Sequence, residues 1–124
     1  MGRIKLETTA VGIDIGSTTA KLVIIKDGAV VYERYERHYS RVRMKTLELL
    51  KDASEYLEGE TFSAAISGSA GLGLALVAGI PFVQEVFATS ETVKKLAPDT
   101  SAVIELGGED AKIIFFEGGT DERM

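Results

Sequence analysis

The sequence predicts an α/β fold: a mixed sheet that opens with three antiparallel strands, followed by the first hairpin of a second unit of the same kind. Short β-branched runs between turn residues predict the opening strands. An amphipathic segment after them predicts a crossover helix. The third observation is a repeat, because residues 10–28 (AVGIDIGSTTAKLVIIKDG) align without a gap with residues 101–119 (SAVIELGGEDAKIIFFEGG). The aligned pairs include Asp14 with Glu105, Gly16 with Gly107, and Lys21 with Lys112.

The opening strands are expected at residues 9–16, 19–26 and 29–38. Only a Gly-Ser-Thr turn separates the first two strands, so they form a tight hairpin. The dipeptide Asp27-Gly28 is a strong hairpin signal between the second and the third. The three strands are therefore predicted to form an antiparallel meander.

Helices and strands alternate in the rest of the chain. Ser40 is suited to cap a helix at 41–58, which leads to a strand at 62–67 that runs parallel to strand 9–16. The later elements are expected in this order: a glycine-rich turn with a short helix at 68–79, a strand at 81–86, a helix at 88–97 and the second hairpin at 101–118. Pro98 to Thr100 marks the predicted boundary, which gives domains 1–99 and 100–124.

The composition restricts the function. The chain has 124 residues, 45% of them hydrophobic, and a formal net charge of -5. This charge argues against nucleic acid as a partner, because phosphate backbones attract basic surfaces. The chain has no cysteine for a disulfide or a thiolate metal site, and its one histidine, His38, is expected at the surface. No apolar run approaches the roughly 20 residues that span a bilayer, so no membrane association is predicted and the cytoplasm is the expected location.

The turn in "DIGSTTAK" (14–21) has the composition of an anion site. Gly16, Ser17, Thr18 and Thr19 offer backbone N–H groups and hydroxyls in a small concavity, and the glycine lets the backbone approach a phosphate closely. Lys21 could add a positive charge, although it is equally compatible with a strand-edge lysine in solvent. A carboxylate at Asp14 suits such a site if Mg²⁺ lies between it and the phosphates. Taken alone, the motif also fits an ordinary polar β-turn.

The repeat of this motif resembles the actin/hexokinase/Hsp70 superfamily, in which two ribonuclease-H-like domains each contribute a first hairpin to bind ATP phosphates. At the level of a family, "VGIDIGSTTAKLVIIKDG" and "IELGGEDAKIIFFEGG" resemble the ATP-dependent activators of 2-hydroxyacyl-CoA dehydratases and benzoyl-CoA-type reductases. The fold class that this resemblance implies is a ribonuclease-H-like (actin-like ATPase) domain with the first hairpin of a second such domain.

The resemblance implies a chemistry as well as a fold. In that family, ATP hydrolysis with Mg²⁺ drives an electron from a [4Fe–4S] cluster, held between two subunits, into a CoA-ester dehydratase or reductase. The cluster cysteines lie downstream of the second hairpin, so this chain resembles an N-terminal piece, and a homodimer is expected of the longer protein. The resemblance assigns phosphate binding to Gly107 and Gly108 and hydrolysis to Glu105, Glu109 and Asp110, where the family motif often reads Asp-x-Gly-Gly-Gln-Asp.

Two other functions stay open. One is a small-molecule kinase of the same superfamily, and the other is a non-catalytic actin-like module that uses nucleotide as a switch or for assembly. By itself the 124-residue chain is expected to fold, to bind ATP at about millimolar concentration or more weakly, and not to hydrolyse it, because hydrolysis requires closure of two domains. The stretch "GSAGLG" (68–73) lacks the third glycine of a dinucleotide fingerprint, so its glycines are attributed to strand–helix packing.

Overall fold

The structure is a computed structural model, and it describes residues 8–107, 111–117 and 121–123. The chain divides into two compact units, one ending at Phe82 and the other beginning at Val83. The predicted domain limits of 1–99 and 100–124 stay a prediction.

The first unit contains a four-stranded mixed sheet in the order β3-β2-β1-β4. Its strands are β1 (Thr9–Ile15), β2 (Thr19–Lys26), β3 (Ala29–Arg37) and β4 (Phe62–Ser67). β1 and β2 pair antiparallel, as do β2 and β3, whereas β1 and β4 pair parallel. The predicted meander and the parallel fourth strand are therefore confirmed.

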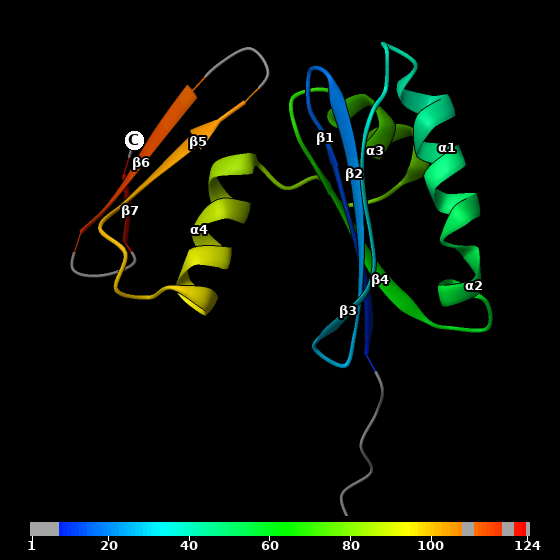
Figure 1. The fold of residues 1–124 in the computed structure, drawn as a ribbon, viewed down its shortest axis with the longest axis horizontal. Helices are drawn as coiled ribbons and strands as arrows, with labels where there is room; N and C mark the ends of the chain where they lie inside the picture. Colours follow the sequence, from blue (N-terminus) through cyan, green and yellow to red (C-terminus); the bar gives the residue numbers. More distant parts are fainter. Residues whose placement is uncertain (1–7, 108–110, 118–120, 124) are drawn as a thin grey trace, which may run out of the picture. The chain divides into compact units, whose positions relative to one another are not determined.

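Helices cover one face of this sheet (Figure 1). They are α1 (Val42–Asp52), α2 (Ser54–Leu57) and α3 (Leu72–Ala78). Alternate residues of the strands point to this face, so Ile13, Leu22 and Ile24 lie in one buried cluster with Leu49 of α1 and Ala75 of α3. Asp14 and Lys21 alternate with these residues along their strands and therefore point to the opposite face of the sheet.

The predicted helix 41–58 differs from the structure at its start and near its end. Arg41, not Ser40, occupies the N-cap, and no side chain caps the helix. Ser40 has a φ of 64°, in the left-handed region, because the chain turns sharply after β3. Near the other end, the helix breaks at Ala53 into α1 and α2.

The predicted strand 81–86 is wrong. Phe82 forms a single parallel bridge with Ile66, and a helix, α4 (Glu85–Leu96), begins three residues later. Extended Gln84 is its N-cap, and Glu85 places a carboxylate in the first turn, where the helix dipole favours negative charge. The helix predicted at 88–97 is therefore present, but it begins three residues earlier and includes the last two residues of the predicted strand.

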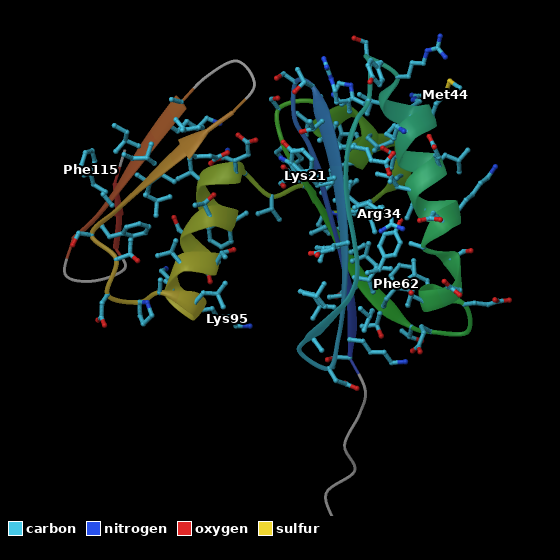
Figure 2. The ribbon with its side chains drawn as sticks, in the orientation of Figure 1. Lys21, Arg34, Met44, Phe62, Lys95 and Phe115 are labelled. Carbon is cyan, nitrogen blue, oxygen red and sulfur yellow. The ribbon has the colours of Figure 1, made fainter. Side chains whose placement is uncertain are left out.

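The second unit consists of α4 and a three-stranded sheet in the order β5-β6-β7 (Figure 1). The strands are β5 (Ala102–Leu106), β6 (Ala111–Glu117) and β7 (Asp121–Arg123), and both pairings are antiparallel. β5 and β6 confirm the predicted second hairpin, whereas β7 was not expected. Ile114 and Phe116 are buried on the face that carries Lys112, whose ammonium donates to Glu85 of α4. Phe115 lies on the side of β6 away from α4 (Figure 2).

Candidate functional site

The tight turn between β1 and β2 is the centre of the candidate site. Gly16 N donates to Thr19 O at 2.9 Å, which closes the turn around Ser17 and Thr18. Ile15 pairs with Ala20 just before it, so the strands stay in register up to the turn. Ser17 is exposed, while Thr18 and Thr19 are half-buried. The structure thus brings together the glycine and hydroxyl residues that the sequence singled out.

Asp14 lies beside this turn, near the end of β1, and each of its carboxylate oxygens accepts a hydrogen bond. Lys21 Nζ donates to Oδ2 at 2.8 Å, and Ser67 Oγ donates to Oδ1 at 2.8 Å. Asp14 and Lys21 are cross-strand partners, so the antiparallel register itself places them together. Lys21 projects from the sheet face opposite α1 (Figure 2), where its ammonium also lies 5.2 Å from the ring centre of Tyr35.

Ser67 is a site residue that sequence reasoning missed. It reaches Asp14 because β4 runs parallel to β1 in a register that pairs residue 67 with residue 14. The carboxyl ends of parallel strands meet at one edge of a sheet, which is where sites of α/β proteins gather. The sequence predicted that strand 62–67 runs parallel to strand 9–16. Aligning the two predicted strands residue by residue would have placed Ser67 beside Asp14.

The glycine-rich segment after β4 packs its backbone against the end of β1. Ala70 N donates to Ile15 O at 3.0 Å, and Gly71 N donates to Gly68 O at 3.0 Å. Gly68 has a φ of +101°, and a Cβ there would lie 2.1 Å from Ile15 O. This close approach explains the glycine, in agreement with the packing role predicted for "GSAGLG". It also fixes the end of β1 that carries Asp14.

His38 corrects the sequence prediction. It was expected at the surface, but its residue is only 4% exposed. Its Nε2 lies 2.8 Å from Gly16 O, and Ser40 N donates to its Nδ1 at 3.0 Å. The turn after β3 folds the ring back over the β1–β2 turn, and no local sequence pattern predicted that turn.

Three basic residues near His38 in the sequence have partners within the first unit. Arg34 lies 5.1 Å from the ring centre of Tyr32 and 3.5 Å from Asp52, and Arg37 lies 5.2 Å from the ring centre of Tyr39. The hydrogen bond that Lys45 donates to Glu48 raises the pKa of the lysine, and the bond to Glu36 raises it further.

The corresponding residues of the second hairpin are differently arranged. Glu105 lies across from Lys112 in the β5–β6 register, but the Lys112 ammonium bonds to Glu85 of α4. Within the described residues, Glu105 Oε2 is buried without a hydrogen-bond partner. Gly107 is exposed. Gly108, Glu109 and Asp110 lie outside the described residues.

Comparison with known proteins assigns the fold to a class. No protein-family model matches the chain. Component A of (R)-2-hydroxyglutaryl-CoA dehydratase from Acidaminococcus fermentans aligns with a TM-score of 0.68 and 27% identity, over 92% of this chain and 45% of that one. The ethanolamine utilization protein EutJ from Carboxydothermus hydrogenoformans aligns with a TM-score of 0.63 and 20% identity, over 94% of this chain and 50% of that one. The fold is that of the actin-like ATPases, as predicted.

Within the actin-like ATPases, the sequence comparison points to the activators of dehydratases. The chain is 32% identical over 114 residues to the (R)-2-hydroxyglutaryl-CoA dehydratase activating ATPase of Acidaminococcus fermentans. The predicted resemblance to the dehydratase activators is therefore confirmed. The match includes 88% of this chain but only 43% of that relative, so the chain spans less than half of its length. In the part of the chain that the structure describes, none of the helices combines the length and the hydropathy of a membrane span.

Proposed function

We propose that the β1–β2 turn binds the phosphates of ATP and that Asp14 holds the Mg²⁺ that accompanies them. The observation that carries this proposal is the position of the Asp14 carboxylate beside a Gly-Ser-Thr turn, with the Lys21 ammonium 2.8 Å away. Backbone amides, hydroxyls and an ammonium are phosphate ligands, and a carboxylate is a Mg²⁺ ligand. Proteins usually bind Mg²⁺ through one or two carboxylates together with substrate phosphates, so this set of groups fits the pair.

Each residue of the turn has a distinct role in this proposal. Gly16 lets the backbone approach the phosphate, while Ser17, Thr18 and Thr19 supply hydroxyls and amides. Lys21 neutralises phosphate charge. When bound, Mg²⁺ neutralises the remaining phosphate charge and is held by the Asp14 carboxylate, which Ser67 orients through its hydroxyl.

The wider role follows from the similarity to the activating ATPase. We propose that the chain is part of an ATP-hydrolysing activator that drives electron transfer to a 2-hydroxyacyl-CoA dehydratase or a benzoyl-CoA-type reductase. Phosphate binding by Gly107 and Gly108, and hydrolysis by Glu105, Glu109 and Asp110, are parts of the same proposal, as are a homodimer and a cytoplasmic location. A [4Fe–4S] cluster requires thiolate ligands, and the chain has no cysteine, so its residues do not fit the cluster.

Nuclear magnetic resonance titration of the isotope-labelled 124-residue chain with ATP tests the site. The expected result is a shift of the Ser17, Thr18 and Thr19 amide signals, with a dissociation constant on the order of 1 mM and tighter binding with Mg²⁺ than with EDTA. Asp14→Asn should abolish the difference between Mg²⁺ and EDTA, because it removes the charge that holds the metal. A phosphate-release assay on the same chain should show no turnover.

Asp27→Asn is the matched control. Asp27 lies in the other turn of β2, where its Oδ1 accepts from Thr8 N, and asparagine keeps that acceptor and tolerates the φ of 50°. This variant should bind like the unmodified chain. If ATP binding by Asp14→Asn depends on Mg²⁺ as strongly as binding by the unmodified chain does, Asp14 does not hold the metal. If ATP shifts only amide signals outside the β1–β2 turn, the turn is not the phosphate site.

A further inference from the structure

His38 connects two turns that are separate in the sequence. The buried ring lies between Gly16 O, 2.8 Å from Nε2, and Ser40 N, 3.0 Å from Nδ1. A backbone N–H can only donate and a carbonyl oxygen can only accept, so Nδ1 is the acceptor and Nε2 carries the hydrogen. Both ring nitrogens are therefore used, and the tautomer is fixed by the backbone on either side.

The backbone of His38 adds to this connection. His38 N donates to Thr18 O at 3.0 Å, and Arg41 N donates to His38 O at 2.8 Å. Residues 39 and 40 both have positive φ, 50° and 64°, which is costly for two successive residues other than glycine. Such strain persists where the surrounding structure enforces it and is concentrated at functional sites. Here the strained turn is what directs Ser40 N–H back to the imidazole.

The two bonds to the β1–β2 turn fix the direction of its amide donors. A trans peptide is planar, and its C=O and N–H point in opposite directions; the described chain contains no cis peptide bond. When His38 holds Gly16 O, the N–H of Ser17 points away from the imidazole. Because His38 N donates to Thr18 O, the N–H of Thr19, which belongs to the same peptide, points away from the His38 backbone.

We propose that His38 is a positioning residue for phosphate binding: it holds the carbonyl groups of the β1–β2 turn so that the Ser17 and Thr19 amides stay directed at the phosphate oxygens. This inference rests on the proposed function of the turn. It assigns His38 no contact with the nucleotide. His38 orders the amide donors of the turn before the nucleotide binds, so the free energy of binding is not reduced by the cost of ordering them.

Two substitutions separate the two ring nitrogens. The side-chain nitrogen of His38→Gln stands as many bonds from Cα as Nε2 does, so it can still donate to Gly16 O. The side-chain oxygen of His38→Asn corresponds to Nδ1, so it can still accept from Ser40 N but cannot reach Gly16. If His38 only stabilises the strained turn, His38→Asn is the milder change, whereas a positioning role makes His38→Gln the milder change for phosphate binding.

The experiment is the resonance titration of the 124-residue chain with Mg-ATP and with inorganic triphosphate, combined with urea unfolding. His38→Asn is expected to weaken both ligands about tenfold, and His38→Gln no more than about threefold, with Asn no less stable than Gln. In the unmodified chain, saturating Mg-ATP should slow solvent exchange of the His38 Nε2 hydrogen, because ligand binding and the ordering of the turn are linked reciprocally. This readout does not depend on the folding of any variant.

The alternative results are distinguishable. Equal affinities of His38→Asn and the unmodified chain, or an exchange rate of the Nε2 hydrogen that Mg-ATP leaves unchanged, overturn the positioning role alone. An unmodified chain whose Ser17 and Thr19 amides do not respond to either ligand overturns the proposed function, and the role of His38 with it.

Discussion

The two hairpins of this chain share a sequence pattern and a register, but their surroundings differ. β1–β2 lies in the middle of a four-stranded sheet with β3 and β4 at its sides, whereas β5–β6 has β7 beside it. Ile13 is 4% exposed, and its counterpart in the repeat, Ile104, is 66% exposed. In the second hairpin α4 lies against the other face, the one that carries Lys112. The repeat therefore specifies a hairpin, while the neighbouring elements decide which face of it is buried.

The charged pairs of the two hairpins show the same difference. Asp14 and Lys21 are cross-strand partners, and so are Glu105 and Lys112. In the first hairpin the lysine bonds to its partner, and β4 adds a hydroxyl donor to the same carboxylate. In the second, α4 supplies a carboxylate to which Lys112 bonds. The acidic residues at this position of the repeat, Asp14 and Glu105, thus have different surroundings, because β4 packs beside the first hairpin and α4 beside the second.

The largest effect is expected at the turn that fixes the end of β1. Gly68→Ala places a Cβ 2.1 Å from Ile15 O at a φ of +101°. The clash adds to the backbone strain, so the free energy of unfolding of the first unit should fall by about 4 kcal/mol or more. Urea unfolding followed by amide signals of each unit measures this loss, and signals of the second unit should keep their midpoint.

Gly73→Ala is the control for this prediction. Gly73 lies within α3, and apart from the neighbouring backbone of its own helix no atom lies within 4 Å of the position its Cβ would take. Alanine in a helix interior is favoured over glycine by about 0.5–1 kcal/mol, so this change should stabilise the same unit. Similar midpoints for Gly68→Ala and Gly73→Ala would contradict the close backbone approach.

A smaller effect is expected from one matched pair of core substitutions. Ile13→Ala removes a buried side chain and should cost about 3 kcal/mol, as large-to-small core changes do. Ile104→Ala, at the corresponding position of the repeat, should change the free energy of unfolding by about 0.5 kcal/mol or less, because that side chain is exposed. Equal costs in the urea midpoints of the two units would show that the Ile104 face is buried in solution.

The sequence predicted most of the first sheet because its signals are local or follow from chain connectivity. β-branched runs separated by Gly-Ser-Thr and Asp-Gly turns indicate a meander, and a helix after it requires a parallel fourth strand. The position of Asp14 at the edge of the turn followed from the same register. These features do not depend on the details of side-chain packing.

The features that were missed depend on contacts between distant segments. Ser67 joins Asp14 only through the register of β4 against β1. His38 is buried because residues 39 and 40 adopt positive φ, which is unusual for tyrosine and serine. The predicted strand at 81–86 was wrong because a run of six residues with three apolar side chains is too short to distinguish a strand from the approach to a helix.

The smallest expected effect distinguishes the two units by pH. Burial, followed by the hydrogen bond to Asp52, raises the pKa of Tyr32 to about 12 from an ordinary value of 10.0. The neutral phenol donates to Asp52 at 2.8 Å and thereby joins β3, the neighbour of the first hairpin, to α1. Because the folded-state pKa is raised, this contribution to stability is complete below about pH 10 and is lost as the pH rises through about 12.

Tyr32→Phe measures this contribution. The variant should be less stable than the unmodified chain by about 1 kcal/mol at neutral pH, since it lacks one hydrogen bond. The difference between the two chains should shrink between about pH 10 and about pH 12, because the unmodified chain loses the bond that the variant never had. All four tyrosines of the chain precede Val83, so the amide signals of the second unit should unfold alike in both chains at each pH. A difference that stays constant over this range would show that Tyr32 stabilises the first unit by packing alone.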